Sequence, residues 1–346
     1  MKSIHKILST NPLFLWILLS MPIAIIVGSL VAFFLWLLDV VTLFRFEHEW
    51  LFYFLPIAGA AIYFLYEQFG KASAAGNKLI IKEAKSPNNG VPLMMAPLIL
   101  ITTIITHLFG GSAGREGTAV QIGGSIAGYA TKRFSLGMHT KQICIIMGIA
   151  AGFGSVFGTV VAGAVFAIEV LANGKLFSTR LLPSLIAAFI ADFVCTQWGI
   201  SHTHYIVQPI HTFSFITAIK VVIAAIAFGL VAWAFICSNH YVQSKTKEWI
   251  GKPWLIPIVG GAMIILLIQL LQTSDYLGLG VNSNNANAVT IVSAFKKGGA
   301  THFSWFWKFV FTTITLSMGF KGGEVTPLFF IGATLGNVLA LVMNQP

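Results

Sequence analysis

Charged residues are scarce in this chain of 346 residues, and acidic ones are the scarcest. Asp, Glu, Lys and Arg together make up 9% of the sequence, whereas 56% of it is hydrophobic. Soluble domains carry roughly 25% charged residues, and a soluble core does not need so much apolar surface. The composition therefore excludes an ordinary soluble domain. It predicts an all-α integral membrane protein whose helices face the lipid bilayer.

Cysteine is almost absent as well. Cys144, Cys195 and Cys237 are far apart and lie in apolar runs, which is typical of small buried hydrophobic residues. Their spacing does not fit a disulfide framework or a metal site. An intramembrane hydrolase would need a nucleophile and base at depth. We identify neither the metalloprotease motif His-Glu-x-x-His nor the hydrolase spacing Gly-x-Ser-x-Gly in the sequence. We therefore expect no metal, no cofactor and no enzymatic activity.

The net charge of +10 arises from 21 Lys and Arg residues set against 11 acids. No nucleic-acid-binding motif accompanies these basic residues, so no nucleic-acid partner is expected. Lys2 and Lys6 have no acid nearby, which predicts a cytoplasmic N-terminus. Many of the other basic residues gather in short segments that are typical of cytoplasmic loops, as at Lys71–Lys85, Lys132–Lys141 and Lys245–Lys252.

Long apolar runs are abundant. The first, Leu13–Leu38, exceeds the roughly 20 residues that span a bilayer and is too long for a signal peptide. We expect it to be a retained, tilted membrane helix. A multi-pass protein with one transport domain over residues 1–346 is predicted, with Tyr276–Gly280 as an extramembrane turn. The further apolar segments are Leu51–Tyr66, Val91–Leu108, Gln142–Ile149, Val156–Leu171, Leu181–Ala191, Lys220–Cys237, Leu255–Leu271, Trp305–Gly319 and Pro327–Met343.

Glycine interrupts several of these segments, most densely at Gly110–Gly124, Gly148–Gly163 and Gly319–Gly323. Short, glycine-broken apolar segments are typical of discontinuous helices whose ends meet near the membrane midplane. Irregular backbone persists at that depth only where it lines a cavity or is buried in protein, so we expect a polar pathway. The layout also indicates two repeats, the first ending at about Ile200 and the second beginning at about Phe213.

Three acids, Glu116, Glu169 and Glu324, lie in or beside the glycine-rich breaks. An ionisable residue in a membrane segment is costly and marks a functional candidate, with a structural ion pair or a loop position as the alternatives. The glycines before Glu116 let the backbone approach a ligand, and a helix that starts there points N–H groups at an anion. A glutamate can occupy such a site and leave it on protonation, which couples anion passage to protons.

Three ordered motifs resemble the signatures of the CLC (voltage-gated chloride channel) family. Gly114–Gly117 resembles the sequence around the family's external gating glutamate, Gly154–Glu169 resembles the second signature, and Gly322–Pro327 resembles the third. The resemblance implies the CLC fold, with two inverted repeats of tilted and discontinuous helices, and a homodimer. It also implies a truncated second repeat, because family members continue for several helices beyond the third signature.

Several positions differ from chloride members in the way that the fluoride-exporting branch differs from them. Asn77 stands where chloride members have a serine that touches the central anion, and Thr118 replaces their proline. Glu324–Thr326 replaces an Ile-Phe-Ala type of sequence, and Val170 replaces the internal proton-transferring glutamate of many exchangers. The resemblance implies a fluoride/proton antiporter, with fluoride and protons as partners, that exports fluoride across a bacterial inner membrane.

Glu116 is implied by the resemblance as the gate and the proton-coupling residue. Phe157 and Phe166 among the supporting positions could line the pathway, and packing is the alternative role. For His107 the two alternatives are a proton relay and helix packing. The implied anion-binding positions are Asn77, Gly114, Arg115, Gly117, Glu324, Val325 and Thr326. The supporting positions are Thr118, Phe157, Phe166 and Glu169.

Two alternative functions stay open at this point. The first is a chloride channel or chloride/proton exchanger of the same fold, which differs from the leading hypothesis in its ion. The second is a non-transporting remnant, which is expected if the protein stops at Pro346, soon after the third signature. Comparing fluoride with chloride flux separates the first alternative from the leading hypothesis.

Overall fold

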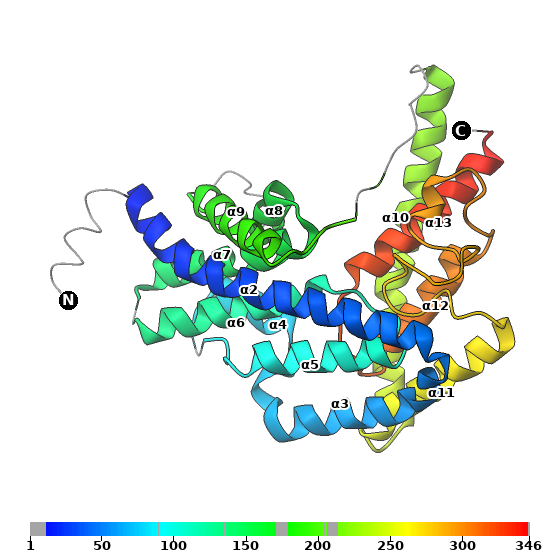
Figure 1. Ribbon diagram of the computed structural model, residues 1–346, viewed down its shortest axis with the longest axis horizontal. Helices are drawn as coiled ribbons and strands as arrows, with labels where there is room; N and C mark the ends of the chain where they lie inside the picture. The colour runs from blue at the N-terminus through cyan, green and yellow to red at the C-terminus, as the bar shows by residue number, and fades with distance from the viewer. Residues whose placement is uncertain are drawn as a thin grey trace. The chain divides into compact units, whose positions relative to one another are not determined.

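The computed structural model describes residues 12–88, 90–134, 136–170, 179–203, 205 and 214–344. These residues form α-helices and short 3₁₀ helices joined by turns, and no strand occurs among them (Figure 1). The prediction of an all-α protein is therefore confirmed. Lys2 and Lys6, on which the orientation of the N-terminus depends, lie outside the described residues.

Five helical spans in the described part are long and apolar enough to cross a membrane. The first reaches a mean hydropathy of 2.5 and belongs to α2, Pro12–Glu47, which continues well beyond the expected Leu13–Leu38. Several other apolar helices are shorter, as the glycine-broken segments predict. The five spans are Trp16–Glu47, Glu49–Phe69, Met138–Phe157, Phe215–Trp249 and Val325–Val342.

The chain divides into two compact units. Unit 1 comprises Met1–Asp39, Leu65–Ile101 and Glu116–His202, and unit 2 comprises Val40–Phe64, Thr102–Arg115 and Thr203–Pro346. Three helices run from one unit into the other, namely α2, α3 (Leu55–Phe69) and α5 (Met95–Leu108). The two repeats expected from the order of segments along the chain stay a prediction.

Unit 1 is built around α7, Met138–Phe157, which packs against four other helices of the unit. All of its residues from Ile143 to Val156 are buried, because neighbours cover it on several sides. Its core joins Ile145 and Ile149 of α7 to Ile80 and Ala188 from two of those neighbours. The helices that surround α7 are α4 (Asn77–Lys85), α6 (Glu116–Arg133), α8 (Val160–Glu169) and α9 (Leu181–Gln197), with η2 (Lys71–Ser73) preceding α4.

The glycines of α6 and α7 bring these two helices into close contact. A Cβ on Gly123 would overlap the carbonyl oxygen of Gly148, and a Cβ on Gly148 would overlap that of Gly123. Small residues at a helix crossing let the backbones approach in this way. The expected break at Gly148–Gly163 is thus wrong in its first part, because α7 continues to Phe157 and only then breaks at Gly158, which has φ +69°.

Unit 2 is organised around α12, Ser304–Ser317, which packs against α10 (Phe215–Trp249), α11 (Leu255–Leu271) and α13 (Val325–Val342). Phe311 of α12 and Phe330 of α13 are fully buried and contribute large apolar side chains to this core. Two 3₁₀ helices complete the unit, η1 (Glu49–Phe54) and η3 (Ser293–Phe295).

Two segments that we expected to be loops have a different structure. Lys245 and Lys247 lie in the last turns of α10 and not in a loop, because the helix continues to Trp249. Tyr276–Gly280 is a turn, but it is largely buried, and Gly278 N–H donates to the carbonyl of Gly111 at 3.2 Å. This turn is therefore part of the interior of unit 2.

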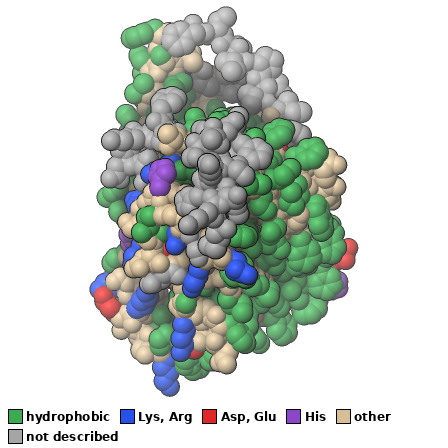
Figure 2. Space-filling view, turned by 90° about the vertical axis from the view of Figure 1, so that its left-hand side faces the viewer, with side chains coloured by type: hydrophobic (Ala, Val, Ile, Leu, Met, Phe, Trp, Pro, Cys, Tyr) green, Lys and Arg blue, Asp and Glu red, His purple; other side chains and the backbone are tan. Residues whose placement is uncertain are grey.

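Apolar side chains lie exposed on many helices of the described part. Phe215 and Trp249 at the two ends of α10 are among the most exposed. In Figure 2, green apolar side chains cover one side of the face in view, while Lys and Arg gather on the other side. Such exposed apolar surface is costly in water and is expected on helices that face lipid.

Candidate functional site

Glu116 is the first residue of α6 and is 2% exposed. The chain before it cannot continue α5 because Gly110 adopts φ +83°, a conformation that favours glycine. Gly117 and Thr118 follow in the first turn and are buried. The first N–H groups of a helix have no partner within it, so the start of α6 combines an ionisable group with the positive end of the helix dipole.

Two glycines join the first and third signature motifs within unit 2. Gly114 N–H donates to the Gly323 carbonyl at 2.6 Å, and Gly323 N–H donates to the Gly114 carbonyl at 2.8 Å. Residues about 200 positions apart in sequence therefore lie side by side. Gly114 is a predicted anion-binding position, and Glu324 follows Gly323 directly, so this bridge places two of the predicted segments together.

Hydroxyl groups hold the same two segments in place. Ser112 N–H donates to Thr315 Oγ1 at 3.1 Å, and Ser112 Oγ lies 2.9 Å from Thr312 Oγ1. On the other segment, Lys321 N–H donates to Thr106 Oγ1 at 3.2 Å. The sequence interpretation missed these contacts. The only signal for them is the presence of buried threonines in apolar helices, which need hydrogen-bond partners at depth.

The expectation that the Gly-x-Ser-x-Gly spacing is missing is wrong, because Gly110–Gly114 has this spacing around Ser112. In hydrolases this spacing forms a turn between a strand and a helix that exposes the serine. Here the turn follows helix α5, and the serine is fully buried against Thr312. The arrangement is a buried hydrogen bond and not a nucleophile beside a base.

The third motif forms the start of α13. Glu324 precedes the helix and is exposed, Val325 is its first residue, and Thr326 in the first turn is 3% exposed. The helix begins here because Pro327 fixes a helical φ within the first turn, where its missing N–H is not needed. Val325 and Thr326 thus lie at a helix N-terminus, as the anion-site prediction requires.

Asn77 is the first residue of α4 in unit 1 and is exposed. Gly76 before it has φ +54° and ends the preceding turn. The start of α4 is therefore the third helix N-terminus at a predicted anion-binding position. That Asn77 contributes to one site with Val325 and Thr326 stays a prediction.

The aromatic residues of the second motif pack against one another. The ring of Phe153 stacks on that of Phe166 with centroids 4.1 Å apart, and it lies 5.0 Å from that of Phe157. All three contact the core of unit 1, which supports the packing alternative for them. Glu169 is the last residue of α8 and is exposed.

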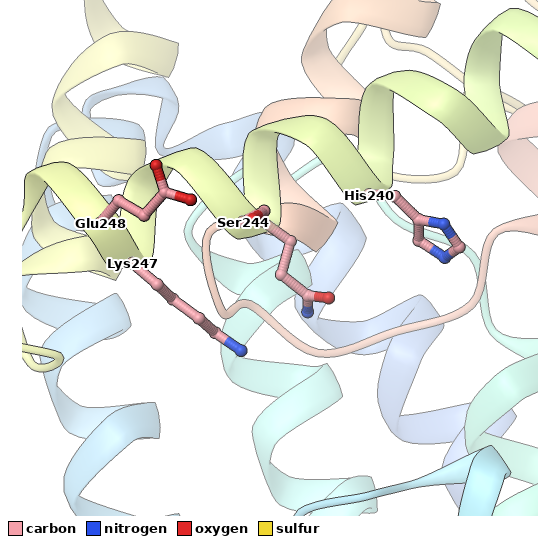
Figure 3. Close-up of a pocket in the computed structure, with 5 residues that line it drawn as sticks. His240, Ser244, Lys247 and Glu248 are labelled. Atoms are coloured by element: carbon pink, nitrogen blue, oxygen red, sulfur yellow. The ribbon is translucent and has the colours of Figure 1, made fainter.

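A hollow of about 460 Å³ lies elsewhere, on α10 (Figure 3). The side chains that line it all come from this one helix, and none belongs to a predicted site position. Lys247 and Glu248 point away from the helix in the view. The lining residues are His240, Gln243, Ser244, Lys247 and Glu248. Across the described residues, no group of three or more His, Cys, Asp or Glu is placed to hold a metal ion.

The sequence and the fold both match known proteins. The model of the voltage-gated chloride channel family matches residues 58–346. The chain is 42% identical to a protein of Pseudomonas syringae pv. tomato named as a chloride/fluoride channel protein, over 96% of this chain and 73% of that protein.

Two solved structures are similar to this one. The crystal structure of a CLC-type fluoride/proton antiporter matches with a TM-score of 0.89 and 35% identity, over 96% of this chain and 83% of that one. The structure of a slow cyanobacterial Cl⁻/H⁺ antiporter matches with a TM-score of 0.77 and 17% identity, over 95% and 80%, which shows the fold alone. The family model matches residues 58–346, and the relative from Pseudomonas syringae is 42% identical over 96% of this chain. The chain therefore belongs to the voltage-gated chloride channel (CLC) family.

Proposed function

We propose that this protein is a fluoride/proton antiporter that exports cytoplasmic fluoride. The observation that carries the proposal is the burial of Glu116 at the start of α6, two residues after the glycine that pairs with the third motif. The relatives add support, because one is named for chloride and fluoride and another is a fluoride/proton antiporter.

In the proposed mechanism, the carboxylate of Glu116 competes with the anion for the donors at the N-terminus of α6. The ionised group is attracted by the helix dipole and its N–H groups. A proton removes the charge and with it this attraction, so the side chain leaves and an anion takes its place. Each exchange of anion for carboxylate then accompanies the uptake or release of a proton.

The anion would be held by backbone N–H groups at helix N-termini and by a few side chains. In the proposal, Gly114, Arg115 and Gly117 contribute from the first motif, and the start of α13 contributes the rest together with Asn77. Fluoride is small and strongly hydrated, and unsatisfied polar groups are costly away from water. A dense set of N–H and side-chain donors is therefore the environment that fluoride needs. The residues proposed from α13 and the turn before it are Glu324, Val325 and Thr326.

The proton would reach Glu116 without an internal glutamate after the second motif, because Val170 occupies that position.

We place the protein in a bacterial inner membrane with the N-terminus in the cytoplasm, and as a homodimer. Lys2 and Lys6 support this orientation, since cytoplasmic segments carry an excess of Lys and Arg.

Chloride transport is the second candidate, because the relative from Pseudomonas syringae is named for both ions. The test compares the initial efflux of fluoride and chloride from liposomes that contain the purified protein. We expect fluoride efflux to be the faster at equal concentration, measured with ion-selective electrodes. Faster chloride efflux would contradict the assignment of fluoride and support the chloride alternative.

A further inference from the structure

Three basic side chains converge inside unit 2, away from the proposed gate residue. They come from the end of α2, the end of α5 and the middle of α12. Arg45 is 8% exposed, His107 is 1% exposed and Lys308 is fully buried. Burying a charged group is costly unless it is paired and hydrogen-bonded, so their partners decide what this cluster does.

All three side chains surround one glycine of the buried turn, Gly278. Lys308 Nζ donates to the carbonyl of Gly278 at 2.7 Å and to that of Tyr276 at 3.1 Å. A Cβ on Gly278 would lie 3.2 Å from Arg45 Nη2 and 3.8 Å from His107 Nδ1. The missing side chain of this glycine therefore leaves a small space that faces a guanidinium and an imidazole.

The carbonyls around the cluster do not compensate its charge. His107 Nε2 lies 3.5 Å from the Gly114 carbonyl. Arg45 Nε is buried and has no hydrogen-bond partner, although its guanidinium carbon lies 4.9 Å from the ring of Phe46. Arginine stays charged and offers five N–H donors, so a buried donor without an acceptor is an unmet demand for an anion.

Acidic side chains do not meet this demand within unit 2. Among the residues that the structure describes there, no Asp or Glu is buried, and none lies within salt-bridge distance of the three basic groups. Glu49 acts electrostatically on Arg45 but is exposed. Asp275 Oδ2 accepts from Val289 N–H at 3.1 Å.

We propose that the space at Gly278, between Arg45 and His107 with Lys308 behind it, is a second halide-binding site. A small monovalent anion there accepts from the guanidinium and offsets its charge. The proposal rests on the proposed function, because an anion transporter brings halide ions to this depth. The site lies beside the segment that carries Gly114, since His107 faces the Gly114 carbonyl, so a bound ion would occupy a waiting position near the proposed pathway.

The test counts halide ions bound per chain by isothermal titration of the purified protein with sodium fluoride, and again with sodium chloride. Gly278→Ala fills the space and removes no charge. Gly298→Ala is the matched control, because Gly298 also has a left-handed backbone, φ +69° against +57°, but has nothing within 4 Å. We expect Gly278→Ala to bind one ion fewer than Gly298→Ala.

Charge is tested separately at Arg45. We expect Arg45→Gln to bind one ion fewer than the wild type and Arg45→Lys to keep both classes of site. Equal stoichiometry in the wild type, Arg45→Gln and Gly278→Ala would overturn the proposal, as would an equal loss in Gly298→Ala. The halide that binds with the higher affinity, fluoride or chloride, is the ion of this second site. Absence of fluoride flux in the wild type would contradict the proposed function instead, so the two failures are distinguishable.

Discussion

Replacing Glu116 with Gln abolishes proton movement while anion flux persists, if this residue is the gate. Gln has nearly the same shape but cannot take up or release a proton near neutral pH. Glu116 is buried and is the acidic residue in the first turn of α6, so the substitution removes the ionisable group from this helix start. Proton uptake driven by a fluoride gradient should fall to the level of protein-free liposomes, measured with a pH electrode.

The matched control for this change is Glu67→Gln. Glu67 is exposed and pairs with Lys71 at 2.7 Å on the surface, and such pairs contribute only about 0–1 kcal/mol. We expect Glu67→Gln to keep both fluoride flux and proton movement. Unchanged proton movement in Glu116→Gln would show that the gate lies elsewhere.

Gly322→Ala should disrupt the pairing between the first and third motifs. Its Cβ would lie 2.5 Å from the Cβ of Ala113 and 3.0 Å from the carbonyl oxygen of Gly114. Overpacking of this kind costs about 1–3 kcal/mol, and every 1.4 kcal/mol corresponds to about tenfold in an equilibrium. Because the strain falls on the bridge itself, we expect fluoride efflux to fall by about tenfold.

Gly332→Ala is the control for Gly322→Ala. Gly332 lies in α13, where a Cβ meets nothing within 4 Å, so its efflux should equal that of the wild type. Thermal unfolding of both variants separates a damaged site from an unfolded protein. Equal efflux in Gly322→Ala and Gly332→Ala would show that the bridge does not shape the anion site.

The helix starts at the candidate site were predictable from sequence because local chemistry determines them. Glycines before Asn77 and Glu116, and a proline after Thr326, mark the places where helices begin. These signals need no knowledge of tertiary structure, since a positive φ or a fixed φ acts on the backbone directly. The motif order added the family and with it the fold.

Other features depend on contacts between distant segments and could not be predicted in this way. Gly148 was expected to interrupt a helix, but its role is to let α6 approach α7. The hydroxyl pair of Ser112 and Thr312 and the meeting of Arg45 with Lys308 at one turn join residues far apart in the sequence. Composition and spacing along the chain carry no signal for such meetings.

The measurement that tests the central claim most directly uses liposomes loaded with fluoride and containing the purified protein. An outward fluoride gradient is the only driving force, and proton movement is recorded as fluoride leaves. A fluoride/proton antiporter should drive protons into the liposomes as fluoride leaves, and uptake should continue against the proton gradient that it builds up. An equal outward chloride gradient should drive the uptake of far fewer protons. Fluoride efflux without proton uptake, or equal coupling to chloride, would contradict the account.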